Sequence, residues 1–317
     1  MKNKLRKTGV FLLISLILFG LNACGPKNPP GSTGDPGDAE YVLTVLATND
    51  LHGHFDTLPK YLTIINQIRS ERENVLLLDA GDIFRRGPYE GYRGEIETAL
   101  FNYMGYNAMA LGNNEFSLPG GKTGPLAAGD AQIADIIGWA DFPVLCGNIT
   151  YKTGGYIEGT LPYITEELGG LKIAIIGITS EKPFSRKYET VSDKEFIPGE
   201  KAVARLLPEA REESDIQIVL SHAGLAADNK IKDVAAVIGG DDHKKLENYA
   251  NKQGVPVTQA GGETKHWLSR LDLFFKQENG EWRLISFENT LYSAEGIEKD
   301  PGLQNLIDSF LEEQIAA

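Results

Sequence analysis

Short runs of apolar, often β-branched residues alternate along the chain with longer segments whose apolar positions recur every three or four residues. The short runs predict buried strands, and the longer segments predict amphipathic helices. Strands are predicted at 41–47, 75–79, 108–111, 144–146, 172–178, 216–220 and 235–238. Helices are predicted at 58–70, 95–104, 131–139 and 201–213. This alternation is typical of a layered α/β fold.

The last part of the chain adds a hairpin to this pattern. Apolar runs at 256–259, 268–275 and 282–288 predict further strands, and the turn Glu278-Asn279-Gly280 joins the last two of them. A final helix is predicted at 304–313. Because neither an internal repeat nor a second change of composition interrupts the pattern, residues 41–317 are expected to form a single domain.

The N-terminus has the features of an export signal. Four basic residues precede the apolar run 10–21, which is short for a membrane span. The run ends in Leu21-Asn22-Ala23-Cys24-Gly25, which resembles a bacterial lipobox. We therefore expect 1–24 to be a lipoprotein signal peptide, with an acylated Cys24 that holds the protein on a membrane of the cell envelope, outside the cytoplasm. The alternative, an uncleaved anchor helix, is disfavoured by the length of the run.

Composition restricts the partners of the chain. Residues 25–40 are rich in Gly, Pro, Ser and Asp, a composition typical of a flexible tether. The formal net charge of -13 disfavours a nucleic acid polymer as partner, since polyanion binding requires a basic surface. Apart from Cys24, the sequence contains one cysteine, Cys146, which lies in an apolar run and is interpreted as a buried side chain.

Polar residues follow five of the predicted strands directly. In open α/β sheets, ligands bind outside the carboxyl ends of strands, so these segments are expected to converge. Their carboxylates, imidazoles and amide oxygens suit divalent cations such as Mn, Zn, Fe, Mg or Ca. Three of the five histidines in the chain lie in these segments. The segments are Asp50-Leu51-His52, Gly81-Asp82, Gly112-Asn113-Asn114-Glu115, Ser221-His222 and Gly239-Gly240-Asp241-Asp242-His243.

These five segments resemble, in the same order, the motifs of the calcineurin-like metallophosphoesterases, and specifically those of the N-terminal catalytic domain of the bacterial 5'-nucleotidase family. The third motif normally reads GNHEF and the fifth GGHTH. The resemblance covers essentially all of 41–313. The first four motifs read Thr48-Asn49-Asp50-Leu51-His52-Gly53-His54, Asp79-Ala80-Gly81-Asp82-Ile83-Phe84, Gly112-Asn113-Asn114-Glu115-Phe116 and Ser221-His222-Ala223-Gly224.

The resemblance implies a four-layer αββα sandwich that holds two divalent metal ions. Asp50, His52 and His243 would hold one ion. Asn113 and His222 would hold the other, and Asp82 would bridge the two. Asp241 stands where the family has the first histidine of GGHTH, and its carboxylate is a competent ligand that favours harder metals.

Two departures from the family pattern affect the chemistry. Asn114 stands at the position of the catalytic histidine, and Ser117 stands at the position of its aspartate partner. Asn114 is still a candidate catalytic residue, because its amide donates a hydrogen bond, but it cannot donate a proton. The family's nucleobase-stacking domain also has no counterpart in the sequence, so base recognition is expected to be weak or to come from a separate substrate-binding protein.

Arg85 and Arg86 directly follow the Asp82 segment. One interpretation makes them catalytic, because a guanidinium holds a phosphoryl oxygen and would partly replace the lost histidine. The other interpretation makes them solvated loop charges that pair with surface carboxylates.

Three functions remain compatible with the sequence. The favoured one is metal-dependent hydrolysis of small phosphate esters, including nucleotides, with a preference for good leaving groups. The second is a catalytically weakened lipoprotein that binds metal or phosphate. The third is hydrolysis of a different ester, such as a sulfur-containing one, on the same metals.

Overall fold

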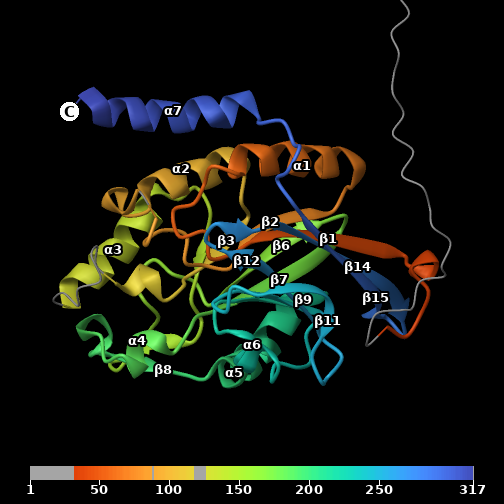
Figure 1. Ribbon diagram of the computed structural model, residues 1–317. Helices are drawn as coiled ribbons and strands as arrows, with labels where there is room; N and C mark the ends of the chain where they lie inside the picture. Colours follow the sequence, from red (N-terminus) through yellow and green to blue (C-terminus); the bar gives the residue numbers. More distant parts are fainter. Residues whose placement is uncertain (1–31, 88, 118–125, 317) are drawn as a thin grey trace, which may run out of the picture.

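Two β-sheets stacked face to face form the middle of the molecule, and helices cover both outer faces (Figure 1). The structure is a computed structural model and describes residues 32–87, 89–117 and 126–316. The expected signal peptide, including Cys24, lies outside these residues. Within them, no helix combines the length and the apolar character that crossing a membrane requires.

The first sheet has six strands in the order β15-β14-β1-β2-β3-β4. The strands β1 to β4 run parallel to one another, and the antiparallel hairpin β14–β15 extends the sheet beside β1. The strands are β1 (Tyr41–Thr48), β2 (Val75–Asp79), β3 (Ala108–Ala110), β4 (Val144–Leu145), β14 (Leu268–Glu278) and β15 (Glu281–Tyr292).

The second sheet has seven strands, ordered β11-β12-β10-β9-β7-β6, with β13 paired to β12. Its strands are β6 (Tyr163–Leu168), β7 (Leu171–Ile178), β9 (Ile216–Ser221), β10 (Ala236–Gly239), β11 (Lys245–Ala250), β12 (Pro256–Gly262) and β13 (Lys265–His266). A separate two-stranded sheet pairs β5 (Ile149–Tyr151) with β8 (Lys194–Phe196).

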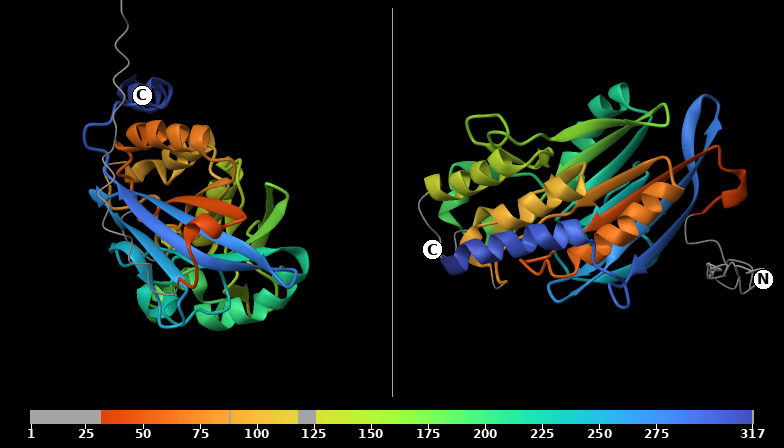
Figure 2. Two further views of the ribbon diagram at one scale, coloured as in Figure 1. Left: turned by 90° about the vertical axis from the view of Figure 1, so that its right-hand side faces the viewer. Right: turned by 90° about the horizontal axis from the view of Figure 1, so that it is seen from above.

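Three helices cover the outer face of the first sheet, and a fourth, α7, packs on the outer side of α1 and α2 (Figure 2). They are α1 (Leu58–Glu71), α2 (Glu95–Met104), α3 (Leu126–Trp139) and α7 (Pro301–Ala316). The second sheet carries α5 (Gly199–Glu213) and the short α6 (Leu225–Asp228), and the short α4 (Lys182–Ser185) follows β7. Single 3-10 turns are η1 (Pro36–Asp38), η2 (Glu90–Tyr92), η3 (Asn114–Phe116) and η5 (Glu189–Val191). The expected four-layer αββα sandwich is therefore confirmed.

The central strands are buried on both faces. On β1, Val45 packs between the sheets and Leu46 packs against the helices of the first sheet. On β7, Ile175 packs between the sheets and Ile176 packs against α5. Burial on both faces explains why these strands read as continuous apolar runs rather than as alternating ones.

Strands that the sequence did not predict are short or lie at sheet edges. The edge strand β6 exposes Glu167, and the edge strand β11 exposes Lys245 and Glu247. Charged residues on an edge strand prevent pairing with other chains, but they also remove the apolar pattern from which a strand is predicted.

Part of the expected tether is attached to the first sheet. The backbone amides of Thr33 and Gly34 donate to the Ile285 carbonyl at 2.8 and 3.0 Å, and the Glu40 amide donates to the Phe275 carbonyl at 2.9 Å. The expectation of a flexible segment through residue 40 is therefore wrong for 32–40. These residues form backbone hydrogen bonds with β14 and β15 that do not depend on apolar side chains.

Glu97 on α2 is a buried carboxyl group beside a loop of the site described below. A Cβ added at Gly53 would lie 3.3 Å from its Oε1 atom. Among the described residues, neither carboxylate oxygen has a hydrogen-bond partner. Burial raises the pKa of Glu97 from 4.5 to about 8, so the side chain is protonated in the folded protein at neutral pH.

We predict that Glu97→Gln flattens the dependence of stability on pH. Between the unfolded pKa of about 4.5 and the folded pKa of about 8, only the folded protein binds this proton, so the free energy of unfolding falls as pH rises. Glutamine cannot ionise and removes this contribution. Urea unfolding of the chelator-treated protein from pH 4 to pH 9 measures the difference. Equal slopes for the variant and the unmodified chain would contradict the assignment.

Candidate metal centre

Five strands of the two sheets deliver the predicted ligands to one place. In each sheet the strands concerned are parallel, so their carboxyl ends share one edge. The loops after β1, β2 and β3 come from the first sheet, and those after β9 and β10 from the second. They carry, in chain order, Asp50, His52, Asp82, Asn113, His222, Asp241 and His243.

The loops turn sharply at the ligand residues themselves. Asp50, His52, Asp82, Asp241 and His243 all have positive φ angles, between 48° and 77°. A left-handed conformation costs about 1–2 kcal/mol for a residue with a Cβ atom. Five of the seven candidate ligands nevertheless adopt it. The direction that the ligand side chains must take, rather than the conformational energy of the backbone, therefore determines the conformation of these loops.

Two glycines allow the loops to approach closely. A Cβ atom at Gly112 would lie 2.2 Å from Asp82 Oδ1. At Gly240 it would lie 3.0 Å from His222 Nδ1 and 3.1 Å from Asp50 Oδ2. Any larger residue at these positions would push the ligand side chains apart.

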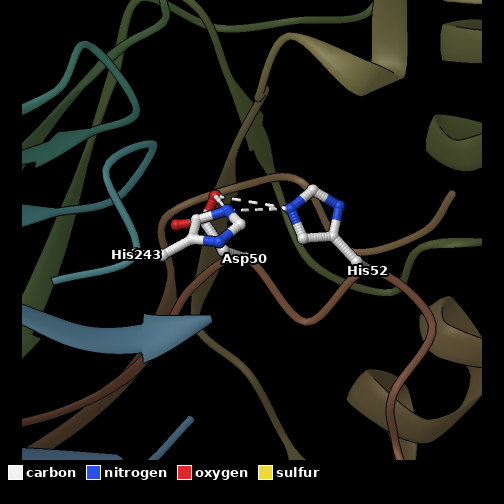
Figure 3. A group of neighbouring side chains, drawn as sticks. All are labelled: Asp50, His52 and His243. Atoms are coloured by element: carbon white, nitrogen blue, oxygen red, sulfur yellow. Dashed lines mark hydrogen bonds and ion pairs between the residues drawn. The ribbon is translucent and has the colours of Figure 1, made fainter. Parts of the chain in front are cut away.

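Asp50, His52 and His243 form a first group of ligand atoms (Figure 3). The Nε2 atom of His243 lies 3.2 Å from Asp50 Oδ1, and that of His52 lies 3.7 Å from the same oxygen. The two Nε2 atoms are 3.1 Å apart. Separations of this size occur between ligands that share a cation at about 2.0–2.2 Å.

A second group joins Asp50, Asp82 and His222. His222 Nε2 lies 3.3 Å from Asp82 Oδ2 and 3.8 Å from Asp50 Oδ1. Asp241 approaches the same nitrogen, with its Oδ1 atom at 3.4 Å. Asn113 Nδ2 donates to Asp82 Oδ2 at 3.3 Å. The structure thus gathers all seven predicted residues. Asp50 belongs to both groups, and Asp82, the predicted bridging residue, also lies near both, with its Oδ2 atom 3.8 Å from His52 Nε2 of the first group.

Three buried ligand-type atoms at this centre have no hydrogen-bond partner among the described residues: Asp50 Oδ1, Asn113 Oδ1 and His222 Nε2. An unsatisfied buried polar atom costs about 1–3 kcal/mol. The Nδ1–H group of His222 donates to the Ala80 carbonyl at 2.6 Å, which leaves the lone pair of Nε2 directed at the carboxylates. The donor set therefore fits a pair of divalent cations.

The charges of the metal-free centre lead to the same conclusion. Although burial opposes it, the charge of His222 and the contacts with His243 and His52 lower the pKa of Asp50. Also against burial, Asp82 and Asp50 raise the pKa of His222 well above its ordinary value. Two ionised carboxylates require positive charge between them. Protonated His222 supplies this charge in the metal-free centre, and a bound divalent cation would supply it in its place.

Glu115 connects the loops after β2 and β3 through hydrogen bonds to their backbone amides. Its Oε2 atom accepts hydrogen bonds from the backbone amides of Gly112 at 2.6 Å and Asp82 at 3.2 Å, and its Oε1 atom accepts one from Ile83 at 3.1 Å. No role was predicted for this residue from the sequence. Its place in the third motif, directly after the two asparagines, was the sequence signal that could have indicated a role at the site.

Arg85 contacts Asn114 and Ser117, the two positions that the resemblance assigns to a histidine–aspartate dyad. Its guanidinium donates to Ser117 Oγ and, at 3.4 Å, to Asn114 Oδ1. The Nε atom is 3.7 Å from a carboxylate oxygen of Glu90, and the side chain is 13% exposed. Arg85 is therefore not a solvated loop charge. Asn114 in turn donates from its side-chain amide to Asp82 Oδ2 at 3.0 Å.

Arg86 lies at the rim of the centre. One amino group is 2.8 Å from His52 Nε2, and the other is 3.1 Å from Glu263 Oε1. The side chain is 51% exposed. Arg86 thus has features of both interpretations. It pairs with a surface carboxylate, and it also contacts a candidate metal ligand.

A pocket of about 340 Å³ opens above the ligand groups. Two of its cationic residues, Lys182 and Arg186, were missed by the sequence analysis. Lys182 Nζ lies 2.6 Å from Asp241 Oδ1. Lys182 lies on α4, and Arg186 directly follows it. The sequence signal for both was their position just past the carboxyl end of a predicted strand, β7. The pocket lining is Arg85, Arg86, Asn113, Asn114, Lys182, Arg186, Tyr188, Asp241, Asp242 and His243.

Cys146 and His266 lie away from the ligand groups. Cys146 is fully buried, and burial raises the pKa of its thiol to about 12, which confirms the structural interpretation. The ring of His266 contacts Thr57 Oγ1 and the Glu263 carbonyl.

We predict that His222→Ala lowers the metal content from two ions to about one per chain, because it removes a ligand of the second group and leaves the first intact. Elemental analysis after dialysis against limiting Mn²⁺ measures the content. His54→Ala, which removes a histidine outside both ligand groups, serves as the control and should retain both ions. Unchanged content in His222→Ala would contradict the assignment of the second group.

Known proteins match both the sequence and the fold. The model of the calcineurin-like phosphoesterase family matches residues 43–245, which include all seven candidate ligands. The trifunctional nucleotide phosphoesterase protein YfkN of Bacillus subtilis is 29% identical, over 88% of this chain and 21% of its own length. Rat 5'-nucleotidase is 32% identical, over 71% of this chain and 40% of its own length. The chain thus spans less than half the length of these relatives.

Solved structures of related proteins have the same fold. A 5'-nucleotidase precursor from Thermus thermophilus superposes with a TM-score of 0.70 at 26% identity, over 87% of this chain and 59% of the other. YfkN itself superposes with a TM-score of 0.71 at 20% identity, over 86% and 97% of the two chains, which supports the fold alone. From the family match and the metal-ligand geometry together, we conclude that this chain belongs to the calcineurin-like phosphoesterase family, whose members use divalent metal ions.

Proposed function

We propose that the protein is a metal-dependent hydrolase of small phosphate esters that works outside the cytoplasm with two divalent ions. The observation that carries the proposal is the set of three buried ligand atoms, on Asp50, Asn113 and His222, that lack a hydrogen-bond partner among the described residues. Buried polar groups are normally hydrogen-bonded, so such a set at the junction of two sheets indicates that bound ions complete it.

Each predicted ligand has a place in this proposal. Asp50, His52 and His243 would hold one ion. Asn113, His222 and Asp241 would hold the other, with Asp82 shared between them. Ions in such a site supply a Lewis acid for the phosphoryl oxygens and lower the pKa of water toward neutrality.

The side chains around the ions would act on the substrate. Arg85 and Arg86 would bind phosphoryl oxygens, because a guanidinium presents paired donors to such an oxyanion. Asn114 would donate one hydrogen bond. None of the three can protonate a leaving group at neutral pH, since arginine stays charged and an amide carries no acidic proton. The proposal therefore includes a preference for esters with acidic leaving groups.

Nucleotides are the proposed substrate class, because the relatives carry the names nucleotide phosphoesterase and 5'-nucleotidase. Those names describe longer proteins. Since this chain matches 21% and 40% of their lengths, we propose that base recognition is weak or comes from a separate substrate-binding protein.

The rate of hydrolysis is predicted to depend steeply on the leaving group. With Mn²⁺, p-nitrophenyl phosphate should turn over at least about 10²-fold faster than AMP, because a missing general acid typically costs 10²- to 10⁴-fold and affects alkyl esters most. Release of phosphate measures both rates. No turnover of either ester, with two ions bound, would favour the binding protein over the hydrolase.

A double variant tests the reason for this preference. Asn114→His with Ser117→Asp restores the dyad of the family, and the new carboxylate would also pair with Arg85. The rate with AMP should rise more than the rate with p-nitrophenyl phosphate. If neither rate changed, the absence of a general acid would not explain the preference.

Attachment to a membrane through Cys24 is part of the proposal. Cys24→Ala should abolish labelling by a fatty-acid analogue and release the protein from the membrane fraction, because the acylated thiol is the proposed anchor. The chain has two cysteines, so Cys146→Ala is a matched control that should keep the label. Labelling that survives Cys24→Ala would refute the anchor.

A further inference from the structure

Asp241 brings a third carboxylate to the second ligand group. Its Oδ1 atom lies 3.4 Å from His222 Nε2, the nitrogen that Asp82 and Asp50 approach at 3.3 and 3.8 Å. The Asp241 backbone amide donates to Asp50 Oδ2 at 2.8 Å, and the side chain is 8% exposed. The histidine carries at most one positive charge, so the metal-free group needs more positive charge than the histidine supplies.

Lys182 supplies further positive charge at this carboxylate. Its Nζ atom lies 2.6 Å from Asp241 Oδ1, the same oxygen that faces the histidine. Lys182 is the first residue of α4, and its backbone amide donates to Ser180 Oγ at 3.3 Å. Among the described residues, the ion pairs of Asp50 and Asp82 are with histidines, and neither carboxylate pairs with a lysine or an arginine. The lysine thus distinguishes Asp241 from the other two carboxylates.

The ammonium group and a divalent ion compete for the same oxygen of Asp241. A carboxylate ligand binds a metal ion at about 2.0–2.2 Å through a lone pair of one oxygen. Asp241 Oδ2 is directed toward Gly224, where it lies 3.1 Å from the position of an added Cβ atom. Oδ1 is therefore the oxygen that would bind the second ion, and the contact with Lys182 places a unit positive charge close to that ion.

We infer that Lys182 opposes binding of the second divalent ion and thereby makes it the more weakly held and exchangeable ion of the two. In the metal-free chain the ammonium group neutralises Asp241, and in the loaded chain the same charge repels the ion. This inference rests on the two-ion site of the proposed function and adds a residue that sets the affinity for one ion. Occupancy of the second site then follows the concentration of free divalent cations.

A purely structural role of Lys182 predicts the opposite effect on metal binding. A contact that only orients a metal ligand strengthens binding, and its loss typically costs 10- to 100-fold in metal affinity. Loss of a repelling charge raises the affinity instead. A unit charge and a dication about 6 Å apart interact by the equivalent of about tenfold in affinity, even at the dielectric constant of water. The direction of the change therefore distinguishes the two roles.

Calorimetric titration of the chelator-treated full chain with Mn²⁺ measures the affinity for each ion without turnover. We expect Lys182→Gln to bind the second ion about tenfold more tightly and the first ion as before. Lys182→Arg keeps the charge and should resemble the unmodified chain. Lys172→Gln is the matched control, because it removes the same charge near the start of β7, at the opposite end of that strand. In a His222→Ala background, which lacks the second site, Lys182→Gln should leave the affinity for the remaining ion unchanged.

Thermal unfolding provides a second measurement. Without metal, Lys182→Gln should lower the unfolding midpoint, because Asp241 loses its opposite charge. At saturating Mn²⁺ this loss should shrink, because tighter binding of the second ion stabilises the folded chain. If Lys182→Gln bound two ions but held the second one equally or more weakly, the inference would be overturned and the proposed function would stand. A chain that binds no ion and hydrolyses no ester would overturn both.

Discussion

Repulsion among carboxylates is the constraint on which the site depends. Asp50, Asp82 and Asp241 all point at His222 Nε2, at 3.3 to 3.8 Å, in a place almost without solvent. Burying several like charges is costly unless opposite charge lies between them. The protein achieves this convergence with left-handed ligand residues, with glycines at the points of closest approach, and with Glu115 holding two loops by their amides.

The sandwich supplies the rigidity that such a centre requires. The central strands are packed on both faces, so a shift of one loop end would disturb both the core between the sheets and the core beneath the helices. Ligands from one sheet are thereby fixed relative to ligands from the other. Because the centre takes ligands from both sheets, the packing of the apolar core between the sheets determines how accurately the ligands are positioned around the metal ions.

Much of this arrangement could be predicted from the sequence, because buried parallel strands and the polar residues after them leave strong local signals. The layered α/β fold and the convergence of the ligands both follow from such signals, whereas the four-layer αββα arrangement was implied by the resemblance to the family. Edge strand β6 gave no such signal, since its exposed residues, Thr165 and Glu167, are polar. The position of Arg85 against Ser117 and of Lys182 against Asp241 depends on contacts between distant loops, which no local pattern records. Residues 32–40 are held by backbone hydrogen bonds, and composition does not reveal these.

The attachment of 32–40 to β14 and β15 also affects orientation. This segment enters the domain at the start of β1, whereas Asp50 and His52 follow the end of the same strand, about 26 Å away for eight residues at about 3.3 Å each. A chain anchored through Cys24, as proposed, would be held at the end of the sandwich opposite the pocket. The pocket would then open away from the lipid surface, toward solutes arriving from the surrounding medium rather than toward lipid headgroups.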